Sequence, residues 1–326
     1  MNQEPPSAES MGRDSRSRSL QRMVSPPVGL VLSLFPGIGL LDRAFEEAGF
    51  SVVRGPDKLW GGDVRDFHAP EGVFVGVIGG PPCQVFSTAS AIRGTDAVDL
   101  IPEFLRVVRE AKPRWVVMEN VRQVIGHPEI PRDWNHTLLR DWDCGGHTAR
   151  TRAFWTWPFM VLVPSRAGGE PSHSVMATTW KRGSSKSQYV KDKGFLPGDL
   201  PVSEYARLQG AEEIGAALEE AKASKAFAVH VLGNGVPLPM GRVIANAARA
   251  FHGDDARRAN DPKLSHGPRW RGPCMAGGEG GGPEAGAVTA RPVGCSAWLA
   301  VDVRRGIFAC GLVDAPNSEK VVSDGN

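Results

Sequence analysis

The chain has 326 residues, of which 41% are hydrophobic and 23% are charged, and its formal net charge is +2. This composition is ordinary for a soluble globular protein and excludes a collagenous or wholly disordered chain. No apolar run reaches the roughly 18 residues of a membrane-spanning helix, and the N-terminus lacks the apolar core of a signal peptide. The small positive charge permits nucleic-acid binding without demanding it.

The chain contains five cysteines, at positions 83, 144, 274, 295 and 310. None of them forms a C-x-x-C pair, so the spacing predicts neither a zinc site nor a disulfide framework. We therefore expect a chain without a metal centre that works in the cytoplasm.

Val28 to Leu34 is an apolar run typical of a buried strand, and an amphipathic helix follows it. The turn between them contains Phe35, Gly37 and Gly39. A strand, a glycine turn and a helix can hold a nucleotide-like ligand against the helix N-terminus. Asp42 occupies the place of the third glycine of a dinucleotide fingerprint, so that fingerprint is absent. A tight turn without any cofactor remains the alternative.

The second predicted strand, Ser51 to Arg54, is followed by two acidic residues. Asp57 lies at the tip of this strand, where an acidic side chain suits a ribose diol. Asp63 precedes the third strand and can accept a hydrogen bond from an adenine amino group. Each acid alone is more often a turn residue, and only their order after the glycine turn favours a ligand.

Val73 to Ile78 is predicted to be a third strand, buried on both faces. Two glycines then let the chain leave the sheet, and two prolines stiffen the backbone before Cys83. Cys83 would lie at the edge where open α/β sheets bind ligands. Its thiolate is a strong nucleophile when its surroundings lower its pKa. A small buried cysteine after a turn is the alternative, and this motif alone does not decide.

Residues 84 to 98 are polar and predict a mobile loop. A helix with apolar residues between Ile101 and Val108 follows, and then a fourth strand, Trp115 to Met118. This strand delivers Glu119 to the same sheet edge as Cys83. A carboxylate activates a thiol poorly, so we interpret Glu119 as an acid acting on the substrate.

Residues 151 to 200 contain seven Lys or Arg and three acids, with tryptophans interleaved. Basic residues among aromatic ones suit a nucleic-acid surface, but a solvated loop region has the same composition. Helices are expected over Pro201 to Gln209, with Ser203 as N-cap, over Ile214 to Val229, and over a last segment that includes Val243 to Phe251. The alternation of strands and helices predicts an α/β fold with a doubly wound, mostly parallel sheet.

Several motifs between residues 29 and 252, in a shared order, resemble those of the cytosine-C5 DNA methyltransferases. These motifs are Phe35-x-Gly37-x-Gly39, Gly80-Pro81-Pro82-Cys83-Gln84, Glu119-Asn120-Val121, Arg150-x-Arg152, Arg207-Leu208-Gln209-Gly210 and Gly233-Asn234-x-Val236-Pro237. The order of six motifs is far more specific than any one of them.

The resemblance implies a Rossmann-like methyltransferase of compact bacterial or phage type, with a very small target-recognition region. It implies S-adenosyl-L-methionine as methyl donor, no metal, and double-stranded DNA as substrate. The catalytic residues would be Cys83, Glu119, Arg150 and Arg152. The cofactor-binding residues would be Phe35, Gly37, Gly39, Asp57, Asp63, Pro81, Asn234 and Val236. The DNA-binding residues would be Gln84, Ser87, Lys181 and Arg182.

The family chemistry assigns a role to each catalytic residue. Cys83 would add to C6 of a flipped-out cytosine, and Glu119 would protonate or hydrogen-bond N3. Arg152 suits the O2 side, and Arg150 would hold Glu119 and the thiolate. The loop of residues 84 to 98 would close over the base.

The resemblance also divides the chain. We expect a catalytic and cofactor-binding domain over residues 28–154, a small basic target-recognition region over 155–200, and helices returning to the catalytic domain over 201–252. Residues 1–27 and 253–326 are expected to be disordered tails. The protein should be a monomer in the cytoplasm of a prokaryotic or phage-infected cell, with no membrane partner. Whether a cognate restriction enzyme accompanies it stays open.

The chain departs from the family pattern in three ways. Thr148 stands where the family has Gln, which puts that side chain's support of the site in doubt. Pro56 to Asp63 is too short for the usual helix. Only residues 155 to 170 remain for the recognition region itself, which predicts a short target or loose specificity.

Three rival functions remain. A tRNA cytosine methyltransferase would share the fold, but Gln84 and the Arg150/Arg152 pair favour the DNA branch. A nicotinamide oxidoreductase would need the third glycine and has no use for Cys83 beside Glu119. A non-catalytic DNA-binding protein on the same fold would not need to keep the catalytic residues.

Overall fold

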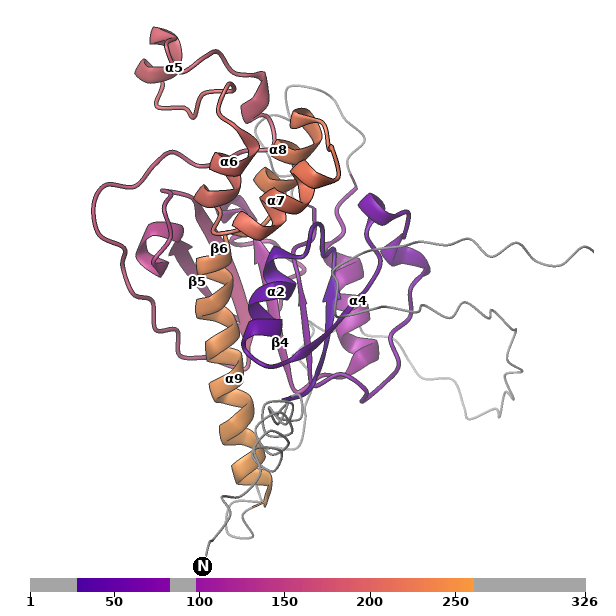
Figure 1. The fold of residues 1–326 in the computed structure, drawn as a ribbon. Coiled ribbons are helices and arrows are strands. Elements are labelled where there is room, and N and C mark those ends of the chain that lie inside the picture. The colour runs from indigo at the N-terminus through magenta and orange to yellow at the C-terminus, as the bar shows by residue number, and fades with distance from the viewer. Residues whose placement is uncertain (1–27, 83–97, 261–326) are drawn as a thin grey trace, which may run out of the picture. The chain divides into compact units, whose positions relative to one another are not determined.

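The computed structural model describes residues 28–82 and 98–260, with side chains up to residue 254. Within these ranges, six strands form one sheet in the order β2-β1-β3-β4-β6-β5 (Figure 1). The strands are β1 (Leu30–Leu34), β2 (Ser51–Arg54), β3 (Gly76–Gly79), β4 (Trp115–Asn120), β5 (Asn135–Arg140) and β6 (Thr151–Trp157). The first four strands in sequence are parallel, β6 pairs antiparallel with β4, and β5 pairs antiparallel with β6. The predicted mostly parallel sheet is confirmed.

Helices cover both faces of this sheet, as a doubly wound fold requires. The helices of the described ranges are α2 (Leu40–Glu47), α4 (Ile101–Ala111), α5 (Gln188–Asp192), α6 (Val202–Leu208), α7 (Glu212–Glu220), α8 (Lys225–Asn234) and α9 (Leu238–Asn260). Two short 3-10 turns, η1 (Lys58–Trp60) and η2 (Val64–Asp66), fill the connection between β2 and β3. The prediction that this connection is too short for a helix is confirmed. None of the helices in the described ranges is long and apolar enough to cross a bilayer.

Each face of the sheet has its own apolar core. Helices α2 and α9 pack together on one face (Figure 1). There the ring of Phe45 stacks on that of Trp115. Helix α4 covers the other face, and its Phe104 is fully buried there. A third cluster around Tyr205 joins α6, α7 and α8. Buried residues recur at helical spacing along α2 and α4, which explains why the apolar periodicity of these helices could be recognised in the sequence.

The structure shifts several predicted boundaries. Strand β3 begins at Gly76 rather than Val73, whose side chain is 48% exposed. Strand β6 continues to Trp157, past the expected domain boundary at residue 154, because Trp157 itself still pairs with Val116 of β4. Helix α9 continues to Asn260, past the expected end at residue 252. Strand β5 was not predicted, since its first four residues are exposed and show no apolar alternation.

The predicted helix Ile214 to Val229 is wrong, because the chain breaks there into α7 and α8. Lys222 has a left-handed φ of 53°, and the hydroxyl of Ser224 accepts a hydrogen bond from the amide of Phe227. Ser224 therefore caps a new helix within a segment whose alanine content suggests continuity. The predicted N-cap at Ser203 is also wrong, since α6 begins at Val202 after Pro201.

The topology of the sheet locates a ligand-binding edge. Strand β1 lies between β2 and β3, so the connections after β1 and β3 leave the sheet on opposite sides. The crevice outside the carboxyl ends of such strands is where doubly wound sheets bind ligands. The turn of residues 35–39 and the turn that follows Gly79 both lie at this edge.

A buried carboxylate lies directly beneath this edge. Asp42, in the first turn of α2, is fully buried and accepts hydrogen bonds from Ser33 of β1 and Arg54 of β2. The Arg54 guanidinium fills the space beside the Cα of Gly39, which has a φ of 77°. Burial raises the pKa of Asp42 to about 6, and the Ser33 and Arg54 hydrogen bonds only partly oppose this effect. The Asp42 carboxyl thus links α2 to the ends of β1 and β2 through hydrogen bonds.

We predict that Asp42 makes stability depend on pH. Because the folded protein holds this proton more tightly than the unfolded chain, the contribution is present below the ordinary pKa and is lost as pH rises through about 6. The unfolding free energy of the wild type relative to Asp42→Asn should fall by about 2 kcal/mol between about pH 4 and pH 7. Chemical denaturation across this range measures it, with the exposed Asp66→Asn as control. A difference independent of pH would contradict the assignment.

Candidate functional site

The turn after β1 is an open cradle with a fixed backbone. Phe35, Gly37 and Gly39 all have left-handed φ values, of 56°, 56° and 77°. A Cβ added to Gly37 would meet no atom within 4 Å, so a ligand can approach this backbone closely. The expected cofactor residues Phe35, Gly37 and Gly39 therefore lie in one turn, which faces open space at Gly37 and is backed by Arg54 at Gly39.

Two side chains from the β2–β3 connection hold this turn. The amide of Gly37 donates to Asp57 Oδ2 at 2.9 Å, and the indole of Trp60 donates to the carbonyl of Gly37 at 2.8 Å. Asp57 also accepts from the amide of Leu59, which caps η1. The structure thus brings Asp57 to the glycine turn, while Trp60, 52% exposed beside it, was missed by sequence reasoning.

Asp63 lies in the same connection and is held by Arg65. The Arg65 Nε and backbone amide both lie 3.0 Å from Asp63 Oδ1. These hydrogen bonds hold the pKa of Asp63 well below its usual range. Asp63 is thus an ionised carboxylate at the start of η2, and Arg65 bonds to both of its oxygens.

The turn after β3 is fastened to the end of β4. Asn120, 2% exposed, donates from Nδ2 to the carbonyl of Pro81 at 3.0 Å and accepts at Oδ1 from the amide of Val121. Pro81 is buried, and the described chain ends at Pro82. Cys83, Gln84, Ser87 and the expected loop of residues 84–98 lie outside the described residues, apart from Val98. Asn120 therefore fixes the backbone from which Cys83 departs.

Glu119 is the buried acid of this edge. Its residue exposure is 9%, and a Cβ added to Gly80 would lie 2.8 Å from Glu119 Oε2, so the carboxylate rests against the Gly80 Cα. The other oxygen, Oε1, lies 2.9 Å from Arg152 Nε. Strand β6 pairs Phe154 with Glu119, which places Arg152 two residues along the same face of the sheet.

Burial dominates the electrostatics of Glu119. Removal of the carboxylate from water raises its pKa, and the nearby cations of Arg152 and Arg150 oppose this shift without cancelling it. The carboxyl group therefore keeps its proton to a higher pH than an exposed Glu does. A protonated carboxyl can donate a hydrogen bond to a heterocyclic nitrogen, which suits a general acid.

Arg150 lies beneath the same edge. Its residue exposure is 4%, and its guanidinium donates to the backbone carbonyls of Val175 and Gly233. It also acts on Glu119 through its charge. Its expected hold on Glu119 and on the Cys83 thiolate stays a prediction, because Cys83 lies outside the described residues.

Thr148 supports the segment that carries both arginines. Its hydroxyl donates to the buried Asp141 at 2.8 Å, and its amide donates to the same oxygen at 2.9 Å. Asp141 also accepts from the amide of His147. The residue that departs from the family pattern thus belongs to a local clamp, which the sequence did not reveal because Asp141 lies outside the motif.

The turn of residues 233–237 returns the chain to the same edge. Asn234 is exposed, and its side-chain nitrogen lies 3.1 Å from His230 Nε2. Val236 is buried at 7% exposure. The fully buried Gln209 donates to the carbonyls of Leu232 and Gly235, and it too was not predicted as a site residue.

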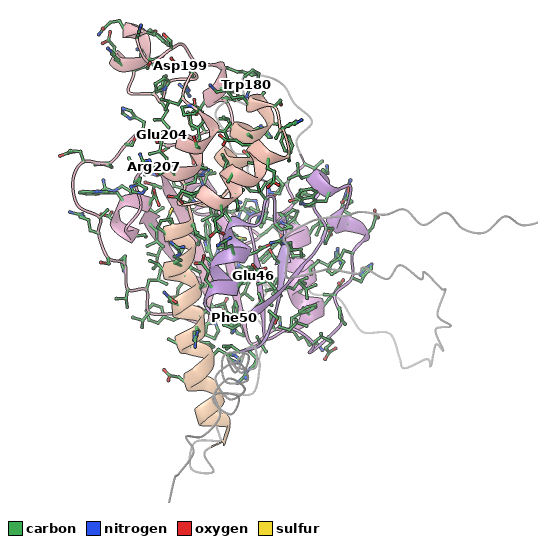
Figure 2. The ribbon with its side chains drawn as sticks, viewed as in Figure 1. Glu46, Phe50, Trp180, Asp199, Glu204 and Arg207 are labelled. Carbon is green, nitrogen blue, oxygen red and sulfur yellow. The ribbon has the colours of Figure 1, made fainter. Side chains whose placement is uncertain are left out.

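Residues 176–200, which contain Lys181 and Arg182 and precede α6, are here called the basic segment. Trp180 and Asp199 lie on this part of the chain, beyond Glu204 and Arg207 of α6 and far from Glu46 and Phe50 (Figure 2). The amino group of the exposed Lys181 lies 5.1 Å from the Trp180 ring.

Arg182 is held more tightly than Lys181. Its guanidinium carbon lies 3.6 Å from the centroid of the Phe195 ring, in a cation–π arrangement. Its side chain is partly buried, and desolvation lowers its pKa slightly from the ordinary range. The two predicted DNA-binding residues therefore lie together on one aromatic-lined surface.

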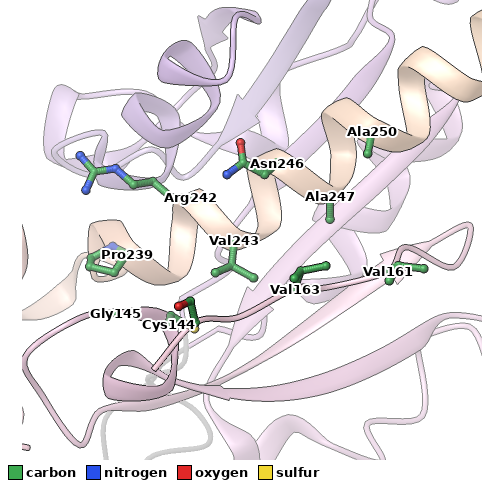
Figure 3. Close-up of a pocket in the computed structure, with 11 residues that line it drawn as sticks. Cys144, Gly145, Val161, Val163, Pro239, Arg242, Val243, Asn246, Ala247 and Ala250 are labelled. Carbon is green, nitrogen blue, oxygen red and sulfur yellow. The ribbon is translucent and has the colours of Figure 1, made fainter. Parts of the chain in front are cut away.

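A hollow of about 380 Å³ lies elsewhere, between α9 and residues 161–165 (Figure 3). Val161, Val163 and Val243 line it, and Cys144 lies at its base. Burial, and then the charges of Asp141 and Asp143, raise the pKa of the Cys144 thiol to about 12, so this thiol is inert as a nucleophile. Across residues 28–82 and 98–254, no group of three or more His, Cys, Asp or Glu side chains could hold a metal ion.

Comparison with known proteins agrees with the motif order. Residues 57–156 match the family model described as C-5 cytosine-specific DNA methylase, and this stretch contains Cys83, Glu119, Arg150 and Arg152. The chain is related to the C-5 cytosine-specific DNA methylases. The matched stretch runs from Asp57 to strand β6, so it includes the catalytic candidates but neither the glycine turn nor residues 181–182 and 233–237.

The similar proteins are longer than the matched region. Type II methyltransferase M.NgoPII of Neisseria gonorrhoeae is 33% identical over 145 residues, which are 38% of this chain and 42% of that protein. Type II methyltransferase M.AquIA of Picosynechococcus is 38% identical over 122 residues, which are 29% of this chain and 49% of that protein. The chain thus spans less than half the length of these relatives.

Among solved structures, the Entamoeba histolytica methyltransferase EhMeth is similar at 12% identity and a TM-score of 0.49. The alignment covers 70% of this chain and 98% of that one.

We predict that the Arg152 cation lowers the pKa of the Glu119 carboxyl, which burial alone would raise further. In Arg152→Gln, the opposing cation is gone while burial remains, so the Glu119 carboxyl should stay protonated to higher pH than in the wild type. Infrared titration of the carboxylic acid band measures this, with Glu119→Gln identifying the band. Titration of Glu119 at its ordinary pKa in both proteins would refute the prediction.

Proposed function

We propose that the protein transfers a methyl group from S-adenosyl-L-methionine to C5 of a flipped-out cytosine in double-stranded DNA. The observation that carries the proposal is the Glu119 carboxyl, buried against Gly80 and paired with Arg152. It stands at the sheet edge next to the turn that leads into Cys83. A raised-pKa acid beside a thiol is what addition to a pyrimidine ring requires.

The residues of the glycine turn fit S-adenosyl-L-methionine. Gly37 faces open space where a Cβ would meet nothing, and Asp57 and Trp60 fix the peptide on either side of it. Phe35, Gly39 and Pro81 border this turn or the next one, Asp63 offers an ionised acceptor, and Asn234 and Val236 close the opposite side. The bound cofactor would supply an electrophilic methyl group on a sulfonium.

The chain's own residues account for the remaining chemistry. The Cys83 thiolate forms a bond to C6 as Glu119 gives a proton to N3, which makes C5 nucleophilic. Arg152 stabilises the charge that develops near O2. After C5 is methylated, loss of its proton to water restores the double bond and expels the thiolate, and the N3 proton returns to Glu119.

The substrate and cellular role extend the same proposal. Lys181 and Arg182 present cations beside the aromatic rings of Trp180 and Phe195, which suits a DNA backbone. Since the relatives carry the name Type II methyltransferase, we propose a bacterial or phage enzyme of the cytoplasm that protects DNA from a cognate restriction enzyme. A tRNA cytosine methyltransferase is the second candidate, and RNA supplied in the assay below distinguishes it.

The nucleophile gives the sharpest test. DNA containing 5-fluorocytosine should trap the wild-type protein, with cofactor present, as a complex that survives SDS, because fluorine cannot leave as a proton does. Cys83→Ser should trap none, since a hydroxyl is a far weaker nucleophile at neutral pH. Cys144→Ala is the matched control, because its thiol has a pKa of about 12, and it should trap normally. Trapping by Cys83→Ser, or trapping of fluorinated tRNA alone, would contradict the proposed function.

The basic surface gives a second prediction. If Lys181 and Arg182 contact phosphates, Ala at both positions should weaken binding to all sequences alike and lower the salt slope by about one unit per lost contact. Lys112→Ala, at the end of α4, is the control for loss of a lysine from the opposite edge of the sheet. The methylated consensus, read by bisulfite sequencing, should not change. A broadened consensus at unchanged affinity would show instead that Arg182 reads a base.

A further inference from the structure

Arg150 lies at a junction of three chain segments. It precedes β6, its exposure is 4%, and its guanidinium donates to the carbonyl of Val175 and, at 2.7 Å, to the carbonyl of Gly233. Val175 is buried and lies six residues before Lys181. Gly233 directly precedes Asn234, in the turn that we assign to the cofactor. One buried cation therefore bonds to both the DNA side and the cofactor side.

The two sides also touch each other directly. A Cβ added to Gly233 would overlap the backbone at Met176 and Ala177, so the end of α8 packs against the start of the basic segment with no room for a side chain. Close-packed backbones of this kind shift together rather than independently. A displacement of the basic segment would thus be transmitted to residues 233–236.

The end of α8 depends on buried side chains for its hydrogen bonds. The last carbonyls of a helix have no partners within the helix, and a cation near them is favoured by the helix dipole. Arg150 satisfies the carbonyl of Gly233, and Gln209 satisfies those of Leu232 and Gly235. Replacing Arg150 leaves a buried carbonyl on each of the two sides without this donor.

We propose that Arg150 is a positioning residue that couples DNA binding to cofactor binding. The proposal rests on the proposed function, because it needs both ligands. DNA that fixes the basic segment also fixes Val175, and through Arg150 and Gly233 it orders the turn that closes the cofactor site. By thermodynamic reciprocity, the cofactor tightens DNA binding by the same factor.

The test measures this coupling without catalysis. The dissociation constant of S-adenosylhomocysteine, which carries no methyl group to transfer, is measured by calorimetry with and without a duplex containing the site mapped by bisulfite sequencing. Wild type should show at least about fivefold tighter binding with the duplex. In Arg150→Gln, the ratio should fall toward one while each ligand still binds alone. Arg242→Gln, which removes an exposed arginine of α9 paired with Glu47, should keep the wild-type ratio.

A second variant covers the case in which Arg150→Gln does not fold. Arg150→Lys keeps the charge but cannot span two carbonyls with a planar fork, so its ratio should be intermediate. A wild-type ratio in either variant would overturn the proposal, as would a wild type that binds and methylates DNA without coupling. A wild type that binds neither S-adenosylhomocysteine nor DNA would overturn the proposed function itself, and this inference with it.

Discussion

The burial of the Glu119 carboxyl is the constraint on which the site depends. A carboxylate this far from water needs a close cation and a pocket shaped around it. Arg152 supplies the cation because β6 runs antiparallel beside β4 and brings its side chain to the same face. Gly80 supplies the space, since any side chain there would displace the carboxylate. The register of β6 and the glycine after β3 are therefore two requirements of one buried acid.

The sheet topology turns this local requirement into a site. Strands β1, β3 and β4 are adjacent and parallel, so the cradle at Gly37, the turn at Pro81 and the acid at Glu119 arrive at one edge. Hydrogen bonds then fix each piece to its neighbour: Asp57 holds Gly37, and Asn120 holds Pro81. Each restraining side chain comes from a strand or connection other than the one whose turn it holds, and these bonds preorganise the edge. Such mutual restraint between neighbouring elements is typical of sites in which a rigid framework holds the reacting groups.

The motifs predicted which residues meet, because periodicity and order are local properties of the chain. The strands carrying Glu119 and the glycine turn, and the mostly parallel sheet, were readable in this way. Several side chains that support the site were not. Trp60, Asp141 and Gln209 act through bonds to segments distant in sequence or outside any motif. Arg150 was identified by its motif, yet its bonds to Val175 and Gly233 depend on how α8 docks, which no spacing in the sequence encodes.

Bisulfite sequencing of plasmid DNA from cells that express the protein tests the central claim most directly. The account predicts that a defined subset of cytosines becomes resistant to conversion with the wild type, and that Glu119→Gln, which cannot give up a proton to N3 as a carboxylic acid does, leaves almost all of them convertible. Complete conversion with soluble, folded wild-type protein, or undiminished resistance with Glu119→Gln, would contradict it.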